Sequence, residues 1–172
     1  MRDLAVFLPF RKNGDKSYKK NTMNNFEITR TTRQNVLNLL KGFTVEQMNM
    51  VPSGSRNNLV WHLGHLLVTQ QLLTYNLSGH KLKIPNELVD KFRKGSEPTK
   101  TYNQEEINEL KEEFLEVVDT TEADYKAGIF TEFTTYETSF GITLSSIEDA
   151  VKFNNVHEGL HMGLIMAMRK LV

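Results

Sequence analysis

The chain has 172 residues, of which 39% are hydrophobic and 24% charged, a composition that suits one globular domain with its own hydrophobic core. The 21 Lys and Arg residues balance the 21 Asp and Glu residues, so neither nucleic acid nor a membrane surface is expected as a partner. The chain has no cysteine, which excludes disulfides, thiolate metal ligands and a cysteine nucleophile and fits a cytoplasmic protein.

Residues 1–22 are expected to form a flexible N-terminal extension, followed by one folded domain over residues 23–172. The apolar stretch at residues 4–10 contains a proline and lacks a small-residue cleavage site, so it does not indicate a secretion signal. No apolar run in the chain approaches the ~20 residues that are needed to span a bilayer.

Two long helices are predicted in the first half of the domain. The first is expected over residues 24–41, where apolar side chains recur at helical spacing and Gly42 provides an end. Thr44 and Gln47 then match a capping box that opens a short helical turn. The second long helix is expected over residues 56–77, with one apolar stripe that faces the core.

A long connection at residues 78–102 follows, and a short helix is expected inside it at residues 87–93. The third long helix is predicted to begin at Asn103, where Glu106 completes a capping box, and to end near residue 126. The aromatic and threonine-rich segment at residues 131–144 is predicted to be an extended loop.

The fourth long helix is expected to begin at a capping box formed by Ser145 and Glu148 and to extend to about residue 170. Four long helices without a series of strands predict an all-α fold. The arrangement expected is a four-helix bundle with a long crossover connection between helices 2 and 3.

The face of the fourth helix that is expected to be buried carries polar residues among apolar ones: Ile147, Ala150, Asn154, His157, His161, Leu164 and Met168. Burying an imidazole without a partner is unfavourable. Two histidines four residues apart lie above one another on a helix, so their ring nitrogens can converge on one point. Metal sites use this geometry because both rings must point inward at a metal–nitrogen distance of ~2.0–2.1 Å.

Two other interpretations of this histidine pair stay open. Residues 157–161 also fit the zinc-protease motif H-E-x-x-H. No third ligand follows at a protease-like spacing, and Glu158 is expected to be a solvated carboxylate at the rim of the helix. Alternatively, both histidines are packing residues that bond to neighbouring polar groups without any metal.

The second helix supplies a possible third ligand in the segment WHLGH at residues 61–65. His65 lies on the apolar stripe with Trp61 and Val68, and a bundle packs such stripes against one another. His62 is about 100° around the helix from Trp61, so it is expected to be partly exposed or to contact a ligand indirectly. His65, His157 and His161 would then leave coordination positions open, as catalytic metal sites do.

Other side chains are candidates for contacts around the metal or in a substrate pocket, although each also has a structural explanation when taken alone. These candidates are Asn58, Trp61, Gln70, Asn154 and Tyr136, with Tyr102 as a further loop residue.

The segments NNLVWHLGHLL at residues 57–67 and YETSFGITLSSIEDAVKFNNVHEGLHMGLIMAMRKLV at residues 136–172 resemble the DinB-like (YfiT-type) superfamily of four-helix bundles. The resemblance covers residues 23–172 and implies that His65, His157 and His161 bind a divalent metal ion. It also implies zinc, nickel or iron as that ion, a homodimer, and members that act as thiol S-transferases or metal-dependent hydrolases.

Three functions remain open on the sequence. The first is a small metalloenzyme whose three-histidine site activates water or a low-molecular-weight thiol, with zinc or nickel before iron as the metal. The second is a non-enzymatic bundle, possibly stress-related, that binds a metal or a small ligand. The third is a metal-free interaction bundle in which the histidines only pack.

Overall fold

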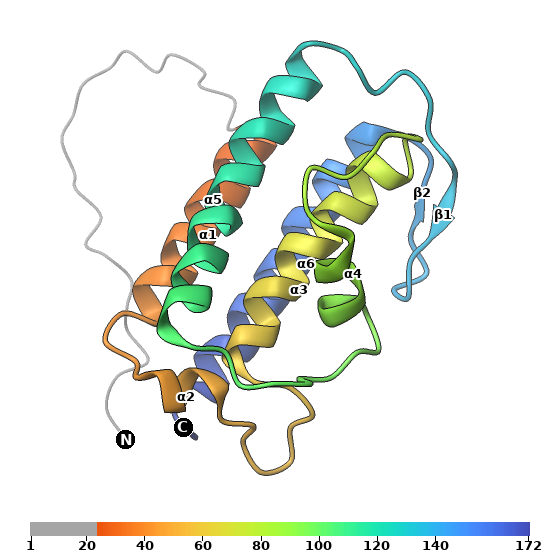
Figure 1. Ribbon diagram of the computed structural model, residues 1–172. Helices are drawn as coiled ribbons and strands as arrows, with labels where there is room; N and C mark the ends of the chain where they lie inside the picture. Colours follow the sequence, from red (N-terminus) through yellow and green to blue (C-terminus); the bar gives the residue numbers. More distant parts are fainter. Residues whose placement is uncertain (1–23) are drawn as a thin grey trace, which may run out of the picture.

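The computed structural model describes residues 24–172, so the extension expected over residues 1–22 lies outside the described residues. Four helical segments form a bundle (Figure 1): α1 (Asn25–Leu39), α3 (Leu59–Gln71) with its π-helical continuation η1 (Leu72–Asn76), α5 (Gln104–Lys126) and α6 (Ile147–Met168). α1 packs against α5 and α6, and α3 packs against the same two helices, so all four surround one core. The prediction of an all-α bundle is confirmed.

Side chains cap the helices close to the predicted positions. Asn103 and Glu106 form the expected capping box at α5, and a second box opens the short helix α2 (Val45–Asn49). α6 begins one residue later than predicted, because Ser146 rather than Ser145 accepts the backbone N–H of Asp149. The predicted box partner, Glu148, therefore lies in the first turn without capping it.

The long connection between the second and third bundle helices returns the chain along the bundle, since α3 and α5 run in the same direction (Figure 1). It contains the predicted short helix, α4 (Asn86–Phe92), which packs against α3. The contact is close at Gly64, where a Cβ atom would lie 2.4 Å from the ring of Phe92. A glycine at this position therefore allows the end of α4 to reach the surface of α3.

The segment at residues 131–144 differs from the predicted loop, because it contains a short antiparallel hairpin of β1 (Tyr136–Glu137) and β2 (Thr143–Leu144). The Thr138 hydroxyl accepts the backbone N–H groups of Phe140 and Ile142, which closes the turn. Leu144 anchors the hairpin in an apolar cluster with residues of η1 and α6. Two-residue strands held in this way carry no alternating pattern that a sequence could show.

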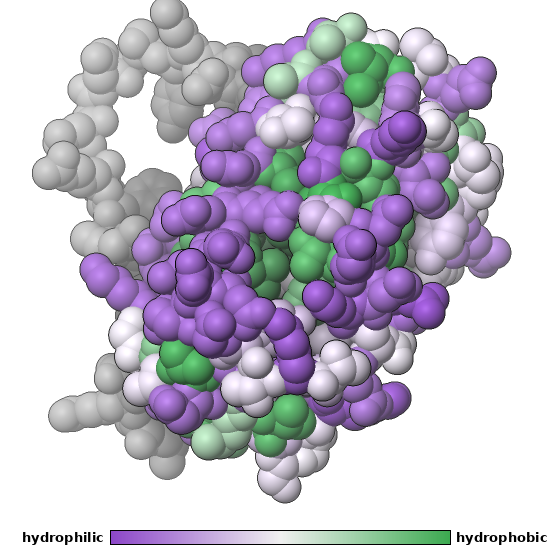
Figure 2. All heavy atoms as spheres, in the orientation of Figure 1, coloured by the Kyte–Doolittle hydropathy of each residue, from purple (hydrophilic) through white to green (hydrophobic). Residues whose placement is uncertain are grey.

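The buried surface of α3 is wider than a single stripe. Almost every side chain from Leu59 to Gln71 is buried, so position around this helix does not separate core from surface. On α6, Leu164 is 42% exposed rather than buried as predicted, and Ile165 enters the core instead. The visible face in Figure 2 is mainly hydrophilic, with hydrophobic side chains mostly in recesses between polar ones.

Within residues 24–172, no helix combines the length and the apolar character that crossing a bilayer requires.

Candidate metal centre

Three histidines from two helices meet inside the bundle. α3 contributes His65, and α6 contributes His157 and His161 from successive turns. Each offers one ligand atom within 4.8 Å of the other two, and all three side chains are buried. The predicted group of three is thus brought together by the packing of α3 against α6.

The spacing of one pair of ring nitrogens suits a shared cation. The Nε2 atoms of His65 and His157 are 3.2 Å apart. Two imidazole nitrogens that each bind a tetrahedral zinc ion at ~2.0–2.1 Å lie roughly 3.3 Å apart. This pair therefore already has the separation that a common ion requires.

A backbone carbonyl determines which nitrogen of His65 is free. Nδ1 lies 2.7 Å from the carbonyl oxygen of Phe92 at the end of α4. A carbonyl can only accept, so Nδ1 carries the proton and Nε2 presents its lone pair toward His157. Trp61 stacks on the same ring, with a centroid distance of 4.5 Å and an interplanar angle of 10°. The imidazole of His65 is thus held in both orientation and tautomer.

His62 was expected to be partly exposed or to contact a ligand indirectly, and its position agrees with the second alternative. Its side chain is only 5% exposed, because α3 is covered on nearly all sides. The Nδ1 atom of His62 lies 2.9 Å from the Nδ1 atom of His161, so one ring donates to the other. A proton on Nδ1 of His161 would leave its Nε2 atom as the metal-binding nitrogen. His62 is therefore a hydrogen-bond partner of the site.

Burial keeps these imidazoles neutral. Loss of hydration, followed by the neighbouring histidines, lowers the pKa of His161 to about 2 and that of His157 to about 3. The same burial lowers the pKa of His62 to about 4 and also lowers the pKa of His65. Neutral imidazole is the form that binds metal ions, so the donor set is ready for a cation at neutral pH.

Glu158 is a correction to the sequence interpretation, since it is fully buried rather than solvated at a rim. Its Oε1 atom accepts from the guanidinium of Arg33 on α1 at 2.7 Å, and both side chains have no exposed surface. Arg33 also donates to the carbonyl oxygens of Phe114 and Leu66. The hydrogen bonds of Arg33 thus join all four bundle helices beside His157 and engage Oε1 of Glu158, which argues against a protease-like base.

The remaining predicted contact residues are scattered. Asn58 caps the N-terminus of α3, and Gln70 donates to Thr121 on α5, so both are held in structural hydrogen bonds. Asn154 donates to Glu158 and lies one turn before it. Tyr102 stacks on the ring of Phe92 and is not among the residues that line the cavity beside the histidines. Tyr136 lines the cavity beside the centre, where it is 42% exposed.

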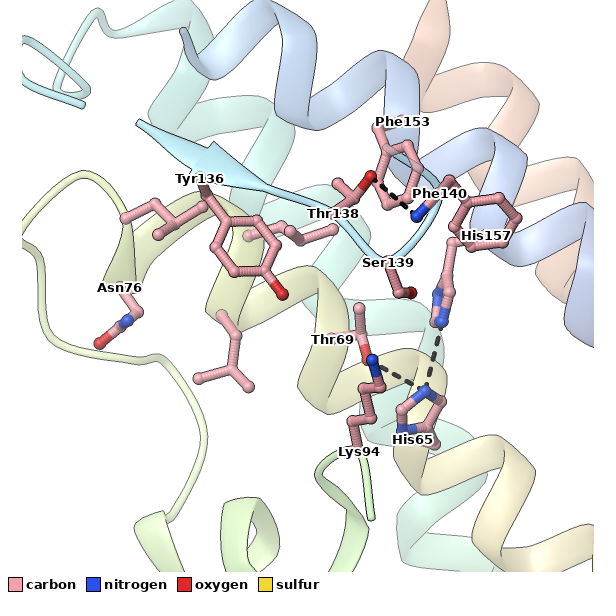
Figure 3. A pocket seen from close by; sticks show the side chains of 13 residues that line it. His65, Thr69, Asn76, Lys94, Tyr136, Thr138, Ser139, Phe140, Phe153 and His157 are labelled. Atoms are coloured by element: carbon pink, nitrogen blue, oxygen red, sulfur yellow. Dashed lines mark hydrogen bonds between the residues drawn. The ribbon is translucent and has the colours of Figure 1, made fainter. Parts of the chain in front are cut away.

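A cavity of about 260 Å³ opens beside His65 and His157. Its walls are formed by α3 with η1, by α6, by the hairpin and by the loop after α4 (Figure 3). The Thr69 hydroxyl lies beside the donor set, with Oγ1 3.4 Å from Nε2 of His65. A small molecule in this cavity would therefore reach two of the three imidazoles.

The sequence profile of the DinB superfamily matches residues 28–165. The chain belongs to the DinB superfamily. The match spans most of the bundle and includes all three histidines of the candidate centre. No curated protein matches the chain. The family resemblance seen in the two sequence segments is thus confirmed.

Several residues of the site carried no sequence signal of their own. His62 was considered for an indirect contact, but the sequence did not indicate His161 as its partner, and the carbonyl of Phe92 belongs to a helix that is distant in sequence. Arg33 was one polar residue on a helix with many. Its burial opposite Glu158 depends on how α1 packs against α6.

Proposed function

We propose that this DinB superfamily member is a small metalloenzyme whose divalent ion is held by His65, His157 and His161. The donor set supports the proposal because three neutral imidazoles converge within 4.8 Å. The single observation that carries it is the hydrogen bond from Nδ1 of His65 to Phe92, since it directs a free lone pair at the Nε2 atom of His157.

A divalent ion at this site would supply Lewis acidity, which lowers the pKa of water or of a thiol that binds to it. Zinc and nickel fit three imidazoles best in our proposal, with iron as a further possibility. The chain's own residues orient the imidazoles, and apolar side chains such as Leu73 and Phe153 line the adjacent cavity.

The cavity lining favours a low-molecular-weight thiol over water as the nucleophile. The described lining contains no Asp or Glu side chain that could serve as a general base for water. A thiol has an ordinary pKa near 8.5 and reacts as the thiolate, so it needs less help with proton removal. The chain has no cysteine, and the thiol would therefore come from a substrate. We therefore propose the thiol S-transferase class for this protein, with hydrolysis as the second candidate reaction.

The first prediction concerns metal content. Untagged wild-type protein should retain about one divalent ion per chain by plasma mass spectrometry, and His65→Ala and His157→Ala should each lose it. His80→Ala is the matched control, because His80 bonds to the carbonyl of Ile129 and belongs to a different part of the fold. Equal metal content in wild type and both site variants would refute the metal centre.

A screen of the metal-loaded protein with thiols and electrophiles separates the enzyme from a non-enzymatic binding bundle. Turnover with one class of electrophile, lost in His65→Ala, supports the transferase assignment. Stoichiometric metal without turnover on thiols, amides or esters would support the binding bundle instead.

A further inference from the structure

The cavity beside the three histidines has a volume that limits its occupant. At about 260 Å³ it holds roughly nine water-sized groups. This is slightly below the range of sites that enclose drug-sized ligands. The occupant is therefore a small molecule with about nine non-hydrogen atoms. The cavity is too small for a peptide segment of a protein partner.

Most of the wall is apolar. The end of the second bundle helix, η1, contributes leucines. Two aromatic rings close the opposite side, where Phe140 of the hairpin packs edge-to-face on Phe153 of α6 with their ring centroids 5.7 Å apart. The apolar lining residues are Leu72, Leu73, Leu77, Phe140 and Phe153. Such a surface recognises the hydrocarbon part of a ligand.

The formal charge in the lining of this cavity is positive. Lys94 is the single Lys, Arg, Asp or Glu side chain among the described lining residues. Within residues 24–172, Lys94 makes no ion pair, although its neighbour Arg93 lies 3.9 Å from Asp90. Figure 3 shows the Lys94 side chain extending from the loop after α4 toward Thr69 and His65. An anion at the metal-facing end of the cavity would thus meet an unpaired ammonium group.

We propose that this cavity binds a small organic anion, a carboxylate with an apolar body, whose charged group is recognised by Lys94 and whose hydrocarbon part lies on Leu73 and Phe153. This proposal names a substrate class for the proposed enzyme, and only the claim that the anion reacts rests on the proposed function. The binding step itself depends only on the cavity and on Lys94.

The test uses hexanoate and its neutral analogue hexanamide as probes. Calorimetric titrations of the full chain are made as purified and again after dialysis against a chelator. We expect hexanoate to bind about threefold more tightly than hexanamide in both states, as for an ion pair with the exposed ammonium group of Lys94. Lys94→Gln should remove this preference, and Arg93→Gln, which deletes the adjacent exposed charge, should retain it.

The apolar wall is tested with a chain-length series on the same protein. Affinity should rise about fourfold for each methylene from butyrate to hexanoate. Lys94→Gln should retain this increment, because the substitution leaves the apolar wall intact. Unchanged melting temperatures of both variants show that the fold is preserved.

The outcomes separate this inference from the metal centre. Equal affinity for hexanoate and hexanamide in the chelated wild type would overturn the role of Lys94, whatever the metal content. A preference that survives in Lys94→Gln would mean that another group binds the carboxylate and would also overturn it. A preference that depends on Lys94 in protein that binds no metal supports the anion site while refuting the proposed function.

Discussion

At the scale of single residues, hydrogen bonding separates two histidines that burial does not. His62 and His65 are 5% and 6% exposed, and both lie on α3. The Nδ1 atom of His65 is bonded to a backbone carbonyl, which frees its Nε2 atom for a metal ion. His62 instead bonds to His161, which is itself a proposed ligand. The two residues therefore act on the centre in different ways.

The second prediction follows from this difference. His62→Phe should weaken metal affinity by about tenfold to a hundredfold without abolishing binding, because it removes the partner that orients His161. Competition with a chromophoric chelator measures the affinity, and His80→Phe is the control. Complete loss of metal in His62→Phe would make His62 a ligand, and unchanged affinity would deny it any positioning role.

At the scale of elements, the approach of α4 to α3 couples the fold to the centre. Gly64 admits the ring of Phe92, and the carbonyl of Phe92 accepts a hydrogen bond from Nδ1–H of His65. The glycine in WHLGH thus has a role that is independent of helix propensity. A side chain at this point would push the end of α4 away from the imidazole that it orients.

The third prediction is that Gly64→Ala destabilises the protein by about 1–3 kcal/mol and also weakens metal binding. The added Cβ would meet ring atoms of Phe92 at 2.4–2.5 Å. Gly159→Ala is the matched control, since a Cβ there meets nothing within 4 Å on the same kind of secondary structure. Urea denaturation and chelator competition measure the two effects. Equal stability of both variants would show that α4 moves aside without cost.

At the scale of the whole molecule, the buried imidazoles link stability to pH. An unfolded histidine has a pKa near 6.5, whereas burial lowers the pKa of His157 to about 3 in the folded chain. Below pH 6.5 the unfolded chain therefore binds more protons than the folded one. The free energy of unfolding is highest above this value and falls as the pH decreases toward 3.

The fourth prediction applies this to the metal-free protein. Its free energy of unfolding should fall by about 2 kcal/mol between pH 7.5 and pH 5 on account of His157 alone. Urea denaturation at the two pH values measures the decrease, and His157→Gln should reduce it. An identical decrease in wild type and His157→Gln would show that other groups account for the pH dependence.

The chain's own sequence determined the helices and the histidine spacing. Helical periodicity and capping residues are local, so the four bundle helices and the capping box at Asn103 were predictable. The i and i+4 placement of His157 and His161 is likewise a property of one helix. The segments around His65 and His157 were also sufficient to suggest the superfamily that the profile confirms.

Tertiary packing decided what surrounds those histidines. The sequence left open whether His62 is partly exposed or contacts a ligand indirectly, and it placed Glu158 in solvent, because helical periodicity assumes one buried face. In the bundle, α3 is enclosed on nearly all sides, and Glu158 meets Arg33 across 125 residues of sequence. The hairpin, Lys94 and the carbonyl of Phe92 also reach the site through the packing of distant segments. Such contacts depend on which helices meet, and this is settled only when the whole core is packed.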